Sequence, residues 1–170
     1  MRHSLHWVMY LKTKHNNKNL HINLLMIASS LCVGAVNYLV NFKKFSEFSE
    51  VKLPSIVLPT WTIIVTLIGS YFLLGKAAAL VCVSDSAEKS DALFIYVVQH
   101  AVCLLCGMFY FVFQEFFLAL CWSAFLILLS VLMTTRFVRC SKNSRRFLYS
   151  YLFILLYAVI VVCSTWLQNK

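Results

Sequence analysis

Charged residues, and acidic residues above all, are scarce in this sequence. Only 12% of the 170 residues carry charge, and six of them are Asp or Glu, whereas 61% are hydrophobic. A typical soluble protein has about 25% charged and about 45–50% apolar residues. Four glycines and two prolines leave little material for long loops. An ordinary water-soluble domain is therefore excluded, because the apolar surface left outside a core would aggregate, and we expect lipid as the solvent.

The sequence also lacks the residue combinations that catalysis and metal binding require. It contains no nucleophile–base pair, no metal-ligand cluster, no glycine-rich phosphate loop and no paired carboxylates. The six acids lie at or near the ends of apolar segments, which argues against an intramembrane carboxylate relay. We therefore expect no enzyme activity, no metal site and no required cofactor.

The seven cysteines do not indicate a disulfide framework. Six of them lie within or at the ends of apolar runs, where cysteine behaves as a small hydrophobic residue. Cys103 and Cys106 have the spacing of a redox or metal motif, but they lie inside an apolar segment. We expect both to serve in packing.

The basic residues predict contact with lipid. Fifteen Lys and Arg against six acids give a net charge of +9, and most basic residues fall between apolar runs, where they meet lipid phosphates rather than nucleic acid. Ten of them fall on the side of the N-terminus and four on the other. This imbalance favours a cytoplasmic N-terminus.

Five apolar segments are long enough to cross a bilayer as helices. They are residues 23–42, 56–83, 92–113, 116–135 and 147–167. Because lipid offers no partner for an unpaired backbone group, each must be helical, and the fold class is all-α, a five-helix transmembrane bundle. Residues 1–22 read as a basic N-terminal tail and 23–170 as the membrane domain. We expect a tight hairpin at Gln114-Glu115 and a short loop over one mouth of the bundle within 43–55.

From the second span onward, prolines, aromatic residues and one glutamine follow a characteristic spacing. The residues are, in order, Pro54-Ser55-x-x-x-Pro59-x-Trp61, Tyr71, Gly75, Leu80-Val81, Tyr96-x-x-Gln99, Phe111, Ala119-Leu120, Thr134-Thr135, Leu148-Tyr149-x-Tyr151-Leu152, Ala158 and Trp166. This pattern resembles the translocator protein family, also called tryptophan-rich sensory proteins or peripheral benzodiazepine receptors. The likeness covers roughly residues 52–168.

The resemblance implies a five-helix membrane protein that binds flat hydrophobic molecules, namely tetrapyrroles such as haem and protoporphyrin, or sterols. It implies a pocket inside the bundle, beneath the loop between the first two helices, and a multi-pass protein of the mitochondrial outer membrane. The sequence by itself leaves the endoplasmic reticulum or another membrane open. Carried over by position, the ligand-binding residues are Trp61, Tyr71, Gln99, Phe111 and Ala158.

The sequence departs from the family pattern at several aromatic positions. Leu67 and Ile154 stand where the family has pocket tryptophans, and Cys103 and Cys106 replace an asparagine and a tryptophan. The oxidative porphyrin chemistry suggested for some members depends on the two pocket tryptophans. It is therefore not expected here.

Several of these residues have a structural interpretation beside the functional one. Trp61 fits an interfacial anchor as well as a pocket wall, and Tyr71 and Gln99 fit interhelical hydrogen bonding as well as ligand contact. His100 is an intramembrane ionisable residue and is therefore a candidate haem ligand, although it is the only histidine within a span. Lys76 either extends toward the interface or meets a ligand propionate.

Three functions remain open from the sequence. The first is a membrane binding protein for a porphyrin or sterol, acting in transport or sensing. The second is a diverged family member without a working pocket that acts as a membrane interaction subunit. The third is a haem-binding redox protein that uses His100. Small residues on the helix faces allow a homodimer, although no GxxxG motif is present.

Overall fold

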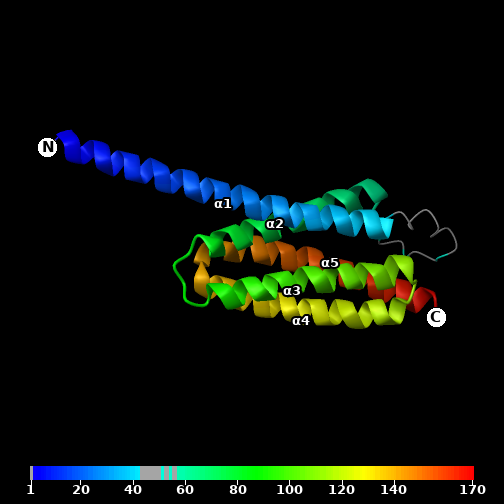
Figure 1. Cartoon of the computed structure of the whole chain (residues 1–170). Helices are drawn as coiled ribbons and strands as arrows, with labels where there is room; N and C mark the ends of the chain where they lie inside the picture. Colours follow the sequence, from blue (N-terminus) through cyan, green and yellow to red (C-terminus); the bar gives the residue numbers. More distant parts are fainter. Residues whose placement is uncertain (1, 43–50, 52–53, 55–56) are drawn as a thin grey trace.

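The fold is an all-α bundle, as the sequence predicts (Figure 1). A computed structural model describes the backbone of residues 2–42, 51, 54 and 57–170, and the side chains of this part except those of 2–18, 42 and 60. Within the described residues, five helices are long and apolar enough to cross a membrane. The loop expected over one mouth of the bundle lies mostly outside the described residues.

The helices follow one another with short connections. Their bounds are α1 Arg2–Phe42, α2 Thr60–Cys82, α3 Lys89–Gly107, α4 Phe116–Cys140 and α5 Arg145–Gln168. A π-helical turn, η2 (Met108–Val112), continues α3, and a 3₁₀ turn, η3 (Lys142–Ser144), precedes α5.

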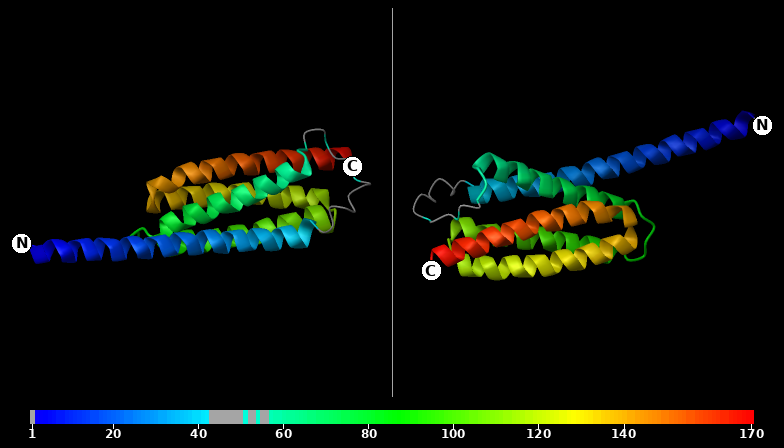
Figure 2. Two further views of the ribbon diagram at one scale, coloured as in Figure 1. Left: turned by 90° about the horizontal axis from the view of Figure 1, so that it is seen from above. Right: turned by 180° about the vertical axis from the view of Figure 1, so that it is seen from behind.

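Helices α1 and α2 do not begin where the predicted apolar segments 23–42 and 56–83 begin. Helix α2 starts at Thr60 rather than at 56, because Pro59 has the extended ψ of 147° and serves as its N-cap. Helix α1 starts at Arg2, so the backbone of the basic stretch is helical and continuous with the first span. This helix projects well beyond the other four (Figures 1 and 2).

The turn between α3 and α4 is as tight as the sequence predicts. Gln114 has a positive φ of 56°, and the amide of Glu115 donates to the carbonyl oxygen of Phe109 at 3.0 Å. Helix α4 begins at the next residue, Phe116. The chain therefore reverses within the three residues 113–115, and α3 and α4 pack against each other along their length.

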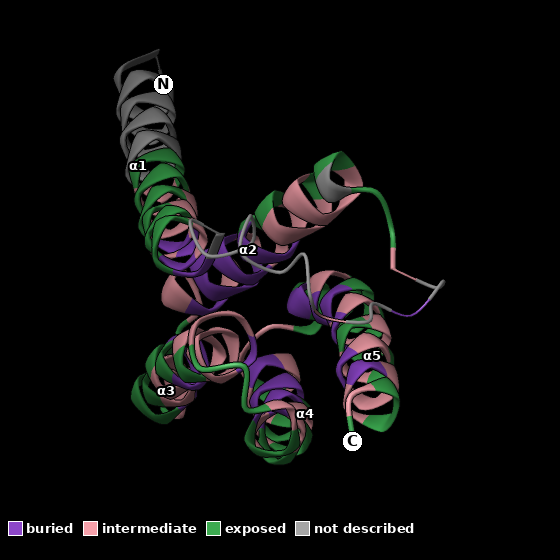
Figure 3. Ribbon diagram, turned by 90° about the vertical axis from the view of Figure 1, so that its right-hand side faces the viewer, coloured by how far each residue is buried: buried purple, intermediate pink, exposed green. Residues whose placement is uncertain are grey.

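The helices are arranged around the bundle in the order α1, α2, α5, α4, α3 (Figure 3). Helices α1 and α2 approach each other closely at Gly75. A Cβ at this position would lie 2.8 Å from the Cα of Ile27 and 2.9 Å from the carbonyl oxygen of Met26. Only glycine lets the two backbones come this close, as is common for small residues in membrane helix interfaces.

At the end where α2 meets α3 and α4 meets α5, two arginines of α4 lie near the carboxylate of Glu88. The carboxylate of Glu88 lies 3.6 Å from the guanidinium of Arg136 and 3.9 Å from that of Arg139. This contact ties the connection between α2 and α3 to the C-terminal turn of α4. The cavity described next lies at the opposite end.

Candidate ligand cavity

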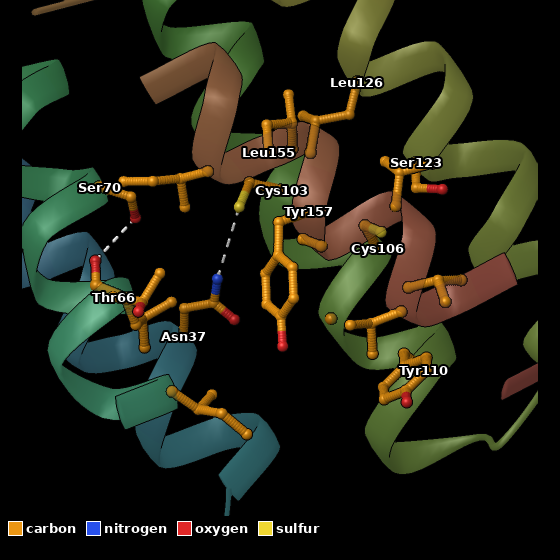
Figure 4. Close-up of a pocket in the computed structure, with 18 of the residues that line it drawn as sticks. Asn37, Thr66, Ser70, Cys103, Cys106, Tyr110, Ser123, Leu126, Leu155 and Tyr157 are labelled. Atoms are coloured by element: carbon orange, nitrogen blue, oxygen red, sulfur yellow. Dashed lines mark hydrogen bonds between the residues drawn. The ribbon is translucent and has the colours of Figure 1, made fainter. Parts of the chain in front are cut away.

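A partly enclosed cavity of about 260 Å³ lies inside the bundle, near the end where α1 stops and α2 starts (Figure 4). All five helices and the segment before α2 contribute to its walls. The lining residues are Asn37, Tyr38, Asn41, Val57, Leu58, Ile63, Thr66, Leu67, Ser70, Cys103, Cys106, Gly107, Tyr110, Phe111, Ser123, Leu126, Tyr151, Ile154, Leu155, Tyr157, Ala158, Val159, Val161 and Val162.

The cavity exists at the positions where the sequence departs from the family pattern. Leu67, Cys106 and Ile154, which replace three family tryptophans, all line it. Each of these side chains is smaller than an indole. The interior is therefore not packed solid at the positions where bulk was lost.

The wall formed by α5 is mainly apolar, and one tyrosine of this helix contacts the segment before α2. Ile154, Leu155 and Ala158 face the cavity from this helix. The backbone amide of Leu58 donates to the hydroxyl of Tyr157 at 3.2 Å. Tyr157, which lines the cavity (Figure 4), thus ties the chain just before α2 to α5.

The opposite wall carries a chain of hydrogen bonds between α1, α2 and α3. The amide of Asn41 donates to the side-chain oxygen of Asn37, and Nδ2 of Asn37 donates to the hydroxyl of Tyr71 at 2.7 Å. The Tyr71 hydroxyl in turn points to Sγ of Cys103 at 3.5 Å. A Cβ at Gly107 would lie 2.5 Å from Nδ2 of Asn41, so the absence of a side chain there makes room for this chain.

Phe111 and Ala158 line the cavity, as the resemblance implies. Trp61 does not line it. It lies in the first turn of α2 with 68% of its surface exposed, as an interfacial anchor would be. The difference arises because the residues of α2 that reach the cavity lie on another face of the helix.

Tyr71 is fully enclosed between helices and does not line this cavity. Its ring packs on Gly34, where a Cβ would lie 2.6 Å from Cδ2, and only 2% of its surface is exposed. Its hydroxyl belongs to the hydrogen-bond chain behind the polar wall. The structure thus gives Tyr71 an interhelical role, and a direct ligand contact stays a prediction.

Gln99 also joins helices without lining the cavity. Its Nε2 donates to the hydroxyls of Tyr151 at 2.8 Å and of Ser130, which links α3 to α5 and α4. The side chain is completely buried, and Oε1 has no hydrogen-bond partner among the described residues. Tyr151, which accepts one of these hydrogen bonds, does line the cavity.

His100 lies in a separate polar cluster between α1 and α3. Its Nδ1 is 2.9 Å from the carbonyl oxygen of Tyr96, and its Nε2 is 3.1 Å from the hydroxyl of Ser30. The Ser30 hydroxyl also lies 2.8 Å from the carbonyl oxygen of Tyr71. Both ring nitrogens therefore have protein partners in this structure, and neither is directed at the cavity.

Two other sequence interpretations concern Lys76 and the cysteines. The ammonium group of Lys76 lies 3.1 Å from Oδ1 of Asn23 on α1, away from the cavity.

Cys103 and Cys106 are free thiols and lie on the cavity wall. No group of three or more metal-ligating side chains occurs among the described residues.

The residues that sequence reasoning missed are Asn37, Asn41 and Tyr157. A signal for the two asparagines was present, because polar residues four positions apart in an apolar span share one helix face and are expected to turn toward the bundle interior. Nothing in the sequence singled out Tyr157 among eight tyrosines.

Comparison with known proteins agrees with the fold and with the resemblance. No curated protein sequence matches the chain. The TspO/MBR family matches residues 24–167, which is nearly the whole chain and overlaps all five spans. This multi-pass membrane protein therefore belongs to the TspO/MBR family.

Proposed function

We propose that this protein binds a hydrophobic polycyclic ligand, a tetrapyrrole or a sterol, inside its helix bundle and serves in the transport or sensing of that ligand. The observation that carries the proposal is the intramembrane cavity to which all five helices contribute. Ligand pockets are typically apolar clefts with a few convergent polar groups, and this cavity has that composition.

The lining supplies the interactions that a flat apolar ligand requires. Burial of apolar surface stabilises a complex by about 25 cal/mol per Å². The rings of Tyr110, Phe111 and Tyr157 offer faces or edges for a planar ligand. The volume of about 260 Å³ lies just below the range of about 300–1,000 Å³ typical of ligand pockets, which suits a single flat ring system.

The proposal is tested by filling the cavity. We expect Ala158→Phe, which places a ring in the cavity, to weaken the binding of protoporphyrin, haem and cholesterol to the detergent-purified protein at least tenfold. Ala101→Phe is the matched control, because Ala101 is exposed on the outer face of α3. Equal loss of binding in both variants, or no saturable binding to the unmodified protein, contradicts the proposal.

The same titration separates the two other functions that the sequence leaves open. A correctly folded protein that binds none of the three compounds supports a membrane interaction subunit. A low-spin haem spectrum that depends on His100 supports a redox protein, although both ring nitrogens of His100 already have protein partners. These contacts argue against coordination of a haem iron by His100.

Location in the mitochondrial outer membrane and formation of a homodimer remain parts of the proposal. The family resemblance supports the first, and the small residues on the helix faces support the second. Fluorescence microscopy of the tagged full chain and its molecular mass in detergent test them separately.

A further inference from the structure

The end of the bundle opposite the cavity carries an unbalanced positive charge. Residues 136–146, which end α4 and begin α5, include five Lys or Arg, and no Asp or Glu occurs from 116 to 170. Two of the five cations lie near Glu88, which belongs to the α2–α3 connection. The other three make no ion pair with a described residue. This basic cluster consists of Lys142, Arg145 and Arg146.

A compact turn holds the basic cluster in place. The backbone amide of Ser141 donates to the carbonyl oxygen of Phe137 at 2.8 Å, and the hydroxyl of the buried Ser144 donates to that of Ser141 at 2.7 Å. The guanidinium carbon of Arg146 lies 4.9 Å from the centroid of the Phe147 ring, within the range of a cation–π contact. All three cations of the cluster are nevertheless exposed, so an anion outside the chain can reach them.

Exposed rings continue from the basic cluster along α5. Tyr149 and Phe153 follow Arg146 by three and seven residues, so the three side chains share one face of the helix. Tyr149 is 56% exposed and Phe153 is 77% exposed. Both lie within the last membrane span, where an exposed ring faces acyl chains. Cations at the end of the span and rings next to them match a molecule with an anionic head and an apolar tail.

We infer that this face of η3 and α5 is a binding site for an anionic phospholipid. Its headgroup lies at the basic cluster, where Lys and Arg donate charge-assisted hydrogen bonds to phosphate oxygens, and one acyl chain lies along Tyr149 and Phe153. A soluble anion or an acidic protein would use the cations but not the rings. The site lies at the opposite end of the bundle from the cavity, so it is independent of the proposed function.

Photo-crosslinking tests the inference on the full-length protein in nanodiscs. Phosphatidylserine and phosphatidylcholine with the same photoreactive acyl chain are compared, and mass spectrometry measures the labelling of residues 147–156. We expect phosphatidylserine to label this segment at least fivefold more than phosphatidylcholine. In the triple variant K142Q/R145Q/R146Q this preference should disappear. The loss of one cation near an anionic headgroup already corresponds to about fivefold.

The triple variant R2Q/K12Q/K14Q is the matched control. It removes the same number of positive charges from the same side of the membrane. The three residues precede the first span, which begins at Asn19, and therefore lie on the part of α1 that projects beyond the bundle (Figure 1). This variant should keep the preference of the 147–156 segment for phosphatidylserine.

Three results overturn the inference, and none of them bears on ligand binding in the cavity. The first is equal labelling of the segment by the two lipids in the unmodified protein, which needs no variant to fold. The second is an equal loss in the two triple variants, which would mean that net charge and not a site attracts the lipid. The third is displacement of the labelled lipid by millimolar inorganic phosphate or glycerophosphoserine at constant ionic strength, which would make the occupant a soluble anion.

Discussion

The side-chain amide of Asn37 on α1 donates a 2.7 Å hydrogen bond to the hydroxyl of Tyr71 on α2. Tyr71 is 34 residues further along the chain, and its ring lies over Gly34, one turn before Asn37. Two helices are thus joined by a ring packed on a glycine and by an amide placed at the end of that ring. The polar wall of the cavity is built on this pair.

Removal of Asn37 should destabilise the bundle. In Asn37→Leu the Tyr71 hydroxyl and the Asn41 amide both lose a partner. We expect the free energy of unfolding to fall by about 1 kcal/mol, since interhelical hydrogen bonds in membranes average about 0.6 kcal/mol and reach about 1.7 kcal/mol. Unfolding by SDS in mixed micelles measures this change.

A double-mutant cycle with Tyr71→Phe isolates the pair, and we expect a coupling energy near 0.6 kcal/mol. Ser150→Ala is the control, because this exposed hydroxyl donates within its own helix, to the carbonyl oxygen of Arg146. A coupling energy of zero would show that the two side chains do not interact in the membrane.

The close approach of α1 and α2 at Gly75 predicts a strong effect of one methyl group. In Gly75→Ala the new Cβ meets the backbone of Ile27 and Met26, which cannot rotate away, so the helices must separate. We expect a loss of about 1–3 kcal/mol in unfolding free energy, the usual cost of overpacking.

Gly69→Ala provides a matched comparison within the same helix. A Cβ at Gly69 meets no atom within 4 Å, so the substitution should be neutral or slightly stabilising through helix propensity. Equal destabilisation by the two substitutions would contradict the helix contact seen here.

Gln99→Leu separates a structural role of this residue from a ligand-binding one. The variant loses hydrogen bonds to Ser130 and Tyr151 but also removes the unpartnered Oε1, so the two effects offset each other. We expect unfolding free energy to change by less than about 1 kcal/mol. Ligand affinity, measured by equilibrium titration, should change less than about threefold, because Gln99 does not line the cavity.

A large loss of affinity in Gln99→Leu at unchanged stability would restore the ligand-contact role that the family resemblance implies for this residue.

Haem titration tests the role of His100. Because Tyr96 and Ser30 occupy both ring nitrogens, we expect the Soret band of added haem to be the same in the unmodified protein and in His100→Ala. Absorption spectroscopy of the oxidised and reduced forms measures this. A low-spin spectrum present only with His100 intact would show that the side chain leaves this cluster to bind iron.

The sequence predicted how many helices there are and roughly where they lie, but it did not predict which face of each helix points into the bundle. Long apolar runs and the scarcity of turn residues predicted five spans, and the single break at Gln114-Glu115 predicted the α3–α4 hairpin. The start of α2 was placed too early, because Ile56, Val57 and Leu58 are as apolar as the helix itself. In a membrane protein, hydropathy does not distinguish a helix from an apolar non-helical segment next to it.

Side-chain roles within the bundle were harder to predict than the spans. Trp61 and Ala158 both belong to the family pattern, yet only Ala158 lines the cavity. In a soluble helix the hydrophobic face marks the interior, whereas in lipid both faces are apolar and that signal disappears. Polar residues such as Asn37 and Asn41 are then the better guide to the interior.

The amino-acid sequence by itself determined that this protein crosses a membrane with five helices. Each apolar segment is long enough to span the bilayer, and a helix satisfies all of its backbone hydrogen bonds within the segment. Only the tertiary structure decided that Leu67, Cys106 and Ile154 surround a cavity and that Asn41 ends a hydrogen-bond chain beside it. The reason is that both properties depend on the rotation of each helix about its axis, which is set by contacts between helices distant in sequence.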